Sequence, residues 1–106
     1  MGPTPRTHWV KLVFTSSAQE DLNRVRIFLE AVSATAAMRA AQRIKKVTSH
    51  LLDHPRIGRA VLSTNGMCED IREVPIQFGM SRYLIRYQIQ TNEIRILRVF
   101  HFKENR

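Results

Sequence analysis

Two adjacent segments near the C-terminus have the period of two that a β-strand requires. In RYLIRYQIQ (residues 82–90), every second residue from Tyr83 to Ile89 is apolar. Thr91-Asn92 is suited to a tight turn, and residues 94–102 follow it as a second strand. This second strand is apolar on both faces in its later half, which favours a central place in the sheet. The sequence therefore predicts an antiparallel hairpin within a larger sheet.

The first half of the chain has a helical period instead. Ser17 and Glu20 have the spacing of a capping box, which predicts a helix start at this point. Asp21 is expected to lie off the apolar face of this helix. That face is predicted to carry Leu22, Val25, Leu29 and Val32.

A second helix is predicted to follow the short break at 33–35, where new N-cap residues occur, and to end before Pro55. So short a join predicts an antiparallel helical hairpin. The opposite side of this helix carries Arg39, Arg43, Lys46 and His50 at steps of four, three and four. These residues either contact phosphate groups or form a solvated helix face. The apolar face is predicted to consist of Ala37, Ala41, Ile44, Val47 and Leu51.

Two further strands complete the predicted fold. Trp9 to Phe14 is apolar enough to pair with the sheet, and Ile71 to Ile76 is a strand in which Pro75 indicates an edge. Residues 56–69 are expected to form a loop. The order β-α-α-β-β-β predicts an α+β fold, with the helical hairpin on one face of a small, mainly antiparallel sheet. We expect a flexible lead-in over residues 1–8 and one domain over residues 9–106.

The charge balance favours an anionic partner. The chain of 106 residues has 17 Lys and Arg against 9 Asp and Glu, a net charge of +8. Nucleic acid, an anionic membrane surface and an acidic protein all fit this charge. The single cysteine, Cys68, excludes a disulfide within the chain and favours the cytoplasm. No apolar run is long enough for a membrane span. His50 and His54 lack the further ligands that a metal site needs, so we expect no metal and no cofactor.

Several arginines interrupt the apolar strand patterns, and Arg86 and Arg98 are expected on neighbouring strands. A turn at residues 91–92 would place Tyr87 opposite Ile96 and Arg86 opposite Leu97. Arg86 and Arg98 would then project from opposite faces, one of them toward the helices or a groove beside them. An arginine in such a groove suits a carboxylate or a phosphate.

Five segments together resemble the RelE/ParE superfamily of type II toxin–antitoxin toxins, and are closer to the ParE branch. They are VKLVFTSSAQEDL, HPRIGR, DIREV, RYLIRYQI and IRILRVFH, in an order that spans nearly all of residues 9–106. The resemblance implies a helical hairpin on an antiparallel sheet, in agreement with the fold predicted above. It also implies a cognate antitoxin that wraps a segment over the toxin in a hetero-oligomer.

The resemblance implies one of two activities. RelE-type members cleave mRNA in the ribosomal A site without a metal, using Lys, Arg and Tyr, whereas ParE-type members inhibit DNA gyrase. Asp70 and Leu84 stand where the nuclease branch has basic residues, and the last tyrosine, Tyr87, is inside a strand. A gyrase inhibitor without enzymatic activity is therefore favoured. The alternatives are a ribosome-dependent mRNA endonuclease and a non-toxic basic module that binds nucleic acid.

The resemblance and the charge pattern lead to three sets of candidate residues. A nuclease would use Arg72, Arg86, His101 and Lys103. The target-binding set is Arg86, Arg98, His101, Lys103 and Arg106. The antitoxin-binding set is Trp9, Leu22, Phe28, Arg39 and Arg43.

Overall fold

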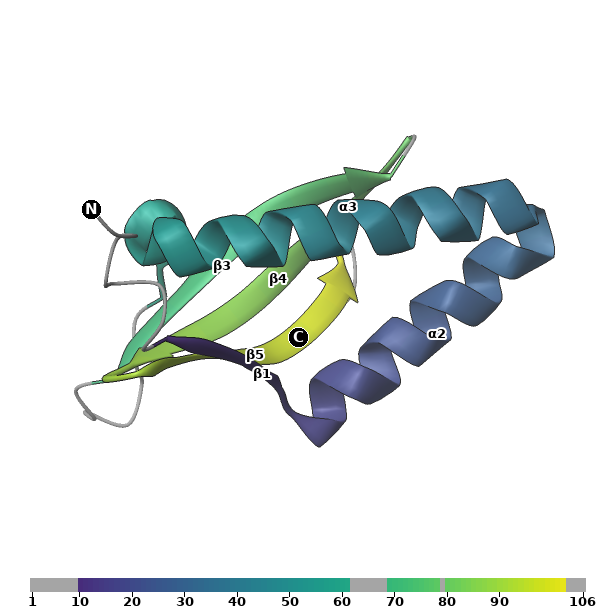
Figure 1. Cartoon of the computed structure of the whole chain (residues 1–106). Coiled ribbons are helices and arrows are strands. Elements are labelled where there is room, and N and C mark those ends of the chain that lie inside the picture. Colours follow the sequence, from purple (N-terminus) through teal and green to yellow (C-terminus); the bar gives the residue numbers. More distant parts are fainter. Residues whose placement is uncertain (1–9, 62–68, 79, 103–106) are drawn as a thin grey trace, which may run out of the picture.

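A computed structural model describes residues 10–61, 69–78 and 80–102. Two helices pack on one five-stranded sheet (Figure 1), which confirms the predicted α+β architecture. Neither helix in the described part of the chain has the length and apolar character that a membrane span requires. The elements are β1 (Lys11–Phe14), α2 (Ser16–Val32), α3 (Ala34–Asp53), the 3-10 helix η1 (Pro55–Ile57), β2 (Arg59–Ala60), β3 (Asp70–Phe78), β4 (Ser81–Gln90) and β5 (Glu93–His101).

The sheet has the order β1-β5-β4-β3-β2. Strand β5 lies inside the sheet as predicted, parallel to β1 and antiparallel to β4. The short strand β2 was not predicted, because it has two residues and pairs only with Arg72 and Glu73 of β3. Pro75 is exposed on β3 beyond the reach of β2, and therefore lies at an edge as expected.

The register of the β4–β5 hairpin differs from the prediction in its second half. Tyr87 lies opposite Ile96 as expected, but an irregularity between Arg86 and Tyr87 shifts the pairing. Arg86 therefore lies opposite Arg98 rather than Leu97. A β-bulge places two residues of one strand against one of the other, and a two-residue turn gives no sign of such an insertion further along the strands.

Helix α2 begins two residues earlier than the proposed capping box at Ser17 and Glu20 would place it. Thr15 is the N-cap, and its hydroxyl oxygen accepts a hydrogen bond from the Ala18 amide at 3.1 Å. The same hydroxyl donates to the carbonyl of Leu97 at 3.1 Å. A cap at Thr15 therefore joins the helix to β5, which a cap at Ser17 would not do. The N-cap of α3 is Ser33, within the predicted break.

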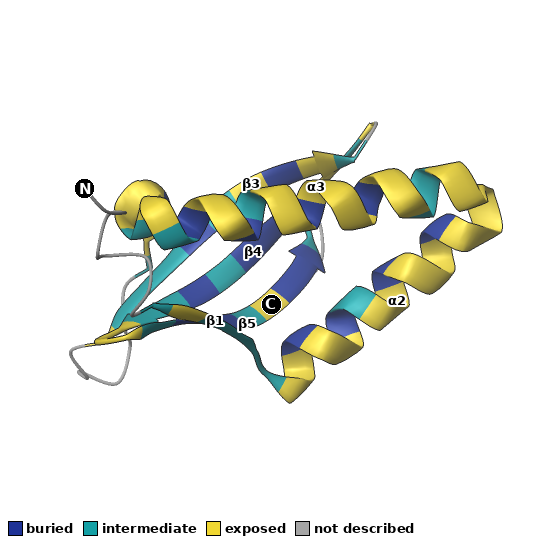
Figure 2. Cartoon of the chain, viewed as in Figure 1, coloured by how far each residue is buried: buried dark blue, intermediate teal, exposed yellow. Residues whose placement is uncertain are grey.

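The core lies between the helices and the sheet, where the facing side chains are buried (Figure 2). Val25, Leu29, Ile44 and Leu51 are buried from the helical side as expected. The predicted apolar faces were wrong at two positions: Val32, at the end of α2, is 67% exposed, and Ala41, inside α3, is exposed. The two helices diverge from their junction (Figure 1), so the turns that are farthest from the junction do not cover each other.

Candidate functional site

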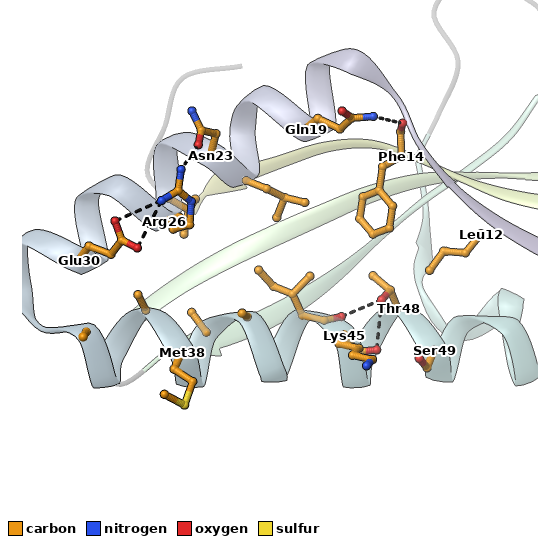
Figure 3. A pocket seen from close by; sticks show the side chains of 17 residues that line it. Leu12, Phe14, Gln19, Asn23, Arg26, Glu30, Met38, Lys45, Thr48 and Ser49 are labelled. Atoms are coloured by element: carbon orange, nitrogen blue, oxygen red, sulfur yellow. Dashed lines mark hydrogen bonds and ion pairs between the residues drawn. The ribbon is translucent and has the colours of Figure 1, made fainter.

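A groove of about 760 Å³ lies between the two helices and strand β1. Figure 3 shows Gln19 of α2 hydrogen-bonded to the Phe14 carbonyl of β1 on one side of the groove, and Thr48 of α3 on the other side. Its apolar lining comes from Leu12, Phe14, Leu22, Val25, Met38, Ile44 and four alanines of α3. An open apolar groove of this shape fits the apolar face of an amphipathic helix.

The polar residues of the groove lie on its two helical walls. Arg26 of α2 forms an ion pair with Glu30 at 3.2 Å, and Lys45 of α3 lines the other wall (Figure 3). The small side chains of Ala37 and Ala41 leave room between these walls. An apolar floor between charged walls complements a helix that has one apolar face and acidic flanks.

The predicted antitoxin-binding residues fall on two surfaces. Leu22 lines the groove. Phe28, Arg39 and Arg43 lie outside it and line a second hollow of about 570 Å³, together with Phe78 of β3. Trp9 lies outside the described residues. The described members of the predicted set therefore lie on two surfaces rather than one.

Two of the predicted target-binding arginines are tied to buried carboxylates. Arg98 Nε donates to Asp21 at 2.7 Å, and Arg86 Nε donates to Glu73 at 2.9 Å. The Arg86 guanidinium also lies 5.4 Å from the centre of the Phe100 ring. Asp21 is 1% exposed and Glu73 is 5% exposed. Both arginines therefore neutralise internal charges.

Asp21 contradicts the prediction that it lies off the apolar face of its helix. Its carboxylate accepts from the Val99 amide at 2.8 Å as well as from Arg98. Burial alone would raise the pKa of Asp21, but hydrogen bonds from Arg98 and the Val99 amide outweigh it and hold the pKa below the ordinary 3.8. The missed signal was spacing, because Asp21 falls at a helical step from Ala18 and Val25.

Arg72 holds the HPRIGR segment against the sheet. Its Nη1 donates to the carbonyls of Gly58 at 3.0 Å and Arg56 at 3.2 Å, and its Nε donates to Asp70 at 2.9 Å. On the same face, the Tyr87 hydroxyl donates to the Pro55 carbonyl at 2.7 Å. The conformation of this segment is thus fixed by side chains from β3 and β4.

Gly58 and Tyr87 fit together closely. The Gly58 amide donates to the Tyr87 hydroxyl at 2.9 Å, and a Cβ atom at position 58 would lie 2.6 Å from that oxygen. Glycine is therefore required by close approach at this position. Burial raises the pKa of Tyr87 above its ordinary 10.0, so the hydroxyl stays protonated and keeps donating to Pro55.

We expect Tyr87→Phe to lower the free energy of unfolding by about 1–3 kcal/mol, because it removes the hydrogen-bond partner of the buried Gly58 amide and of the Pro55 carbonyl. Urea unfolding followed by circular dichroism measures this loss. Ile57→Ala is the control in the same segment, since Ile57 is 55% exposed. A loss no larger than that of the control would show that the hydroxyl is not important for stability.

The described members of the predicted nuclease set do not converge on one point. Arg72 shares its sheet face with Tyr87, whereas Arg86 pairs with Glu73 on the alternate face. His101 lies near the far end of the sheet, with its ring 5.1 Å from that of Tyr83. Lys103 and Arg106 lie outside the described residues, as does Cys68. Within residues 10–61, 69–78 and 80–102, no group of three potential metal ligands occurs.

Comparisons with known proteins agree on one kind of relative. A family model described as the ParE toxin of the type II toxin–antitoxin system parDE matches residues 12–106. Toxin RelE1 of Caulobacter vibrioides is 32% identical over 84% of this chain and 89% of its own length. Toxin RelE2 of the same organism is 30% identical over 86% of this chain and 93% of its own length.

The fold also matches a solved structure. A chain of the chromosomal ParDE toxin–antitoxin system from P. aeruginosa superposes with a TM-score of 0.66. The match covers 89% of this chain and 97% of that chain, at 20% sequence identity. At this identity the likeness concerns the fold.

Proposed function

Because the chain belongs to the ParE toxin family of type II toxin–antitoxin systems, we propose that it inhibits DNA gyrase when free and is neutralised by a cognate antitoxin. The observation that carries the proposal is the family match over residues 12–106. The toxin acts in the cytoplasm and needs no cofactor.

The arrangement of the basic residues supports inhibition by binding rather than RNA cleavage. A nuclease that works without a metal needs several cationic or proton-transferring groups around one phosphate. Arg72 is occupied by backbone carbonyls and Asp70, and Arg86 is occupied by Glu73. Neither guanidinium is available as a free cation beside a bound phosphate.

The second candidate is a RelE-like endonuclease that acts on mRNA in the ribosome. Its specific support is the naming of the curated relatives as RelE toxins. In this case Arg72, Arg86, His101 and Lys103 would have to act together, which requires rearrangement of at least the Arg72 and Arg86 ion pairs.

The antitoxin is proposed to insert an amphipathic helix into the groove between α2 and α3. Leu22 and Phe14 offer apolar contacts to this helix, and Lys45 offers a cation to its acidic flank. A segment that orders on binding can cover the whole length of the groove. The resulting complex is a toxin–antitoxin hetero-oligomer.

Two assays run in parallel test the target. We expect the purified toxin to inhibit supercoiling by DNA gyrase and to leave mRNA intact on translating ribosomes. Prior incubation with the antitoxin should restore supercoiling, which separates specific inhibition from precipitation of the enzyme. Cuts in the A-site codon together with unimpaired supercoiling would replace the first proposal by the second.

A further inference from the structure

The outer side of α3 carries a line of exposed basic side chains. This stripe consists of Arg39, Arg43, Lys46 and His50, and all four side chains are exposed. Steps of four, three and four keep them on one side of the helix. From residue 39 to residue 50 the helix rises about 16 Å. The stripe borders two surface hollows, one lined by Arg39 and Arg43 and the other by Arg43, Lys46 and His50.

The basic residues of the stripe differ from most other arginines of the molecule, because no acidic side chain of the described residues forms an ion pair with them. In the described part of the chain, acidic residues form ion pairs with Arg24, Arg26, Arg56, Arg72, Arg86, Arg95 and Arg98. No ion pair within the described ranges involves Arg39, Arg43 or Lys46. Helix α3 has a single acidic residue, Asp53, at its last position. The positive charge of the stripe is thus left for an external anion.

We propose that this stripe binds the phosphate backbone of duplex DNA, independently of sequence. Phosphates recur along each strand of the duplex, so a line of about 16 Å is long enough to contact more than one of them. Contacts from Arg and Lys to phosphates position a protein on the duplex and carry no base information. This surface is separate from the groove between the helices, because none of the four residues lines that groove.

Duplex DNA fits the stripe better than the other anionic polymers. Single-stranded nucleic acid is held chiefly by stacking on aromatic side chains, and the stripe contains no Phe, Tyr or Trp. An acidic peptide needs apolar or aromatic anchors, and Phe28 and Phe78 lie beside Arg39 and Arg43 in the second hollow, so a peptide anchored there would engage one end of the stripe rather than its whole length. A phosphate backbone needs charge alone. The DNA-binding role goes beyond gyrase inhibition, and would bring the toxin close to the duplex on which gyrase acts.

Fluorescence anisotropy of a labelled duplex of arbitrary sequence, titrated with the full-length toxin at several salt concentrations, tests the proposal. Phosphate contacts from the three charged residues Arg39, Arg43 and Lys46 predict a slope of log affinity against log salt of about −3. Affinity should then fall about 40-fold between roughly 50 and 200 mM salt. The double variant Arg39→Ala/Arg43→Ala should retain a slope of about −1 and bind at least about 10-fold more weakly at low salt.

The matched control is Lys11→Ala/Arg59→Ala, which removes the same net charge from exposed residues of β1 and β2 outside the stripe. We expect it to bind DNA nearly as well as the unmodified toxin. Equal losses in the two double variants would overturn the proposal, since binding would then reflect net charge. Tighter binding to single-stranded RNA or to polyglutamate than to the duplex would also overturn it. The assay contains no gyrase, so its failure leaves the proposed target unaffected.

Discussion

Asp21→Ala is expected to lower the free energy of unfolding by about 2–4 kcal/mol, because it removes the acceptor of the buried Val99 amide and the ion pair with the half-exposed Arg98. A domain of this size has a total stability of roughly 5–15 kcal/mol, so this loss is a large share. The melting temperature should fall by more than about 10 °C. Calorimetry or thermal circular dichroism measures it directly.

The reason for so large an effect is the position of Asp21 at the edge of β5. Strand β1 ends at Phe14, opposite Ile96, and beyond this point no strand of the described residues pairs with β5 on that side. Helix α2 takes the place of a strand there. The Thr15 hydroxyl binds the Leu97 carbonyl, and the Asp21 carboxylate binds the Val99 amide. Loss of Asp21 therefore uncovers a sheet edge as well as breaking an ion pair.

Arg24→Ala provides the control for this prediction. Arg24 contacts the same carboxylate at 3.2 Å, but its side chain is 59% exposed. Its loss should cost no more than about 1 kcal/mol, as is usual for an exposed ion pair. If Asp21→Ala were as mild as Arg24→Ala, the edge interaction would not be important for the fold.

The same carboxylate gives a pH dependence of stability. The pKa of Asp21 in the folded protein lies below the ordinary value of 3.8. In the unfolded chain the pKa is close to this ordinary value. Its contribution is therefore complete above about pH 4 and is lost as the pH falls through the lower, folded pKa. Unfolding measured from neutral to acidic pH should show a steeper loss in the unmodified protein than in Asp21→Ala.

The spacing of apolar residues predicted the fold because it follows directly from which side chains are buried. The alternation in RYLIRYQIQ (residues 82–90) placed β4, and the apolar character of residues 94–102 placed β5 inside the sheet. The bulge at Arg86 and the partners of Asp21 are different, because both depend on residues far apart in the sequence. The period of the apolar residues cannot predict which carboxylate binds which arginine.

The same limit applied to the candidate site. An arginine in a strand has the same sequence pattern whether it is solvated or paired, and Arg86 and Arg98 were both assigned to target binding before Glu73 and Asp21 were located beneath them. The groove was not predicted either. It arises from the angle between α2 and α3 (Figure 1), which a two-helix pattern with a short join does not specify.

Ala41→Trp is expected to weaken antitoxin binding at least 100-fold, because an indole at this position would fill the groove between α2 and α3. Ala41 is exposed and small, and it lines the groove where the proposed antitoxin helix lies. Affinity measured by calorimetry with the purified antitoxin tests this. Inhibition of gyrase by the variant alone should be unchanged, since Ala41 is not among the residues predicted to bind the target.

Ala31→Trp is the matched control, because Ala31 is exposed on α2 and does not line the groove. It adds the same apolar area elsewhere on the hairpin, so it should leave antitoxin affinity within a few-fold of the original. In cells that make both proteins, Ala41→Trp should therefore be toxic where Ala31→Trp is not. Equal affinities for the two variants would mean that the antitoxin binds a different surface, and the second hollow, lined by Phe28 and Arg39, would become the leading candidate.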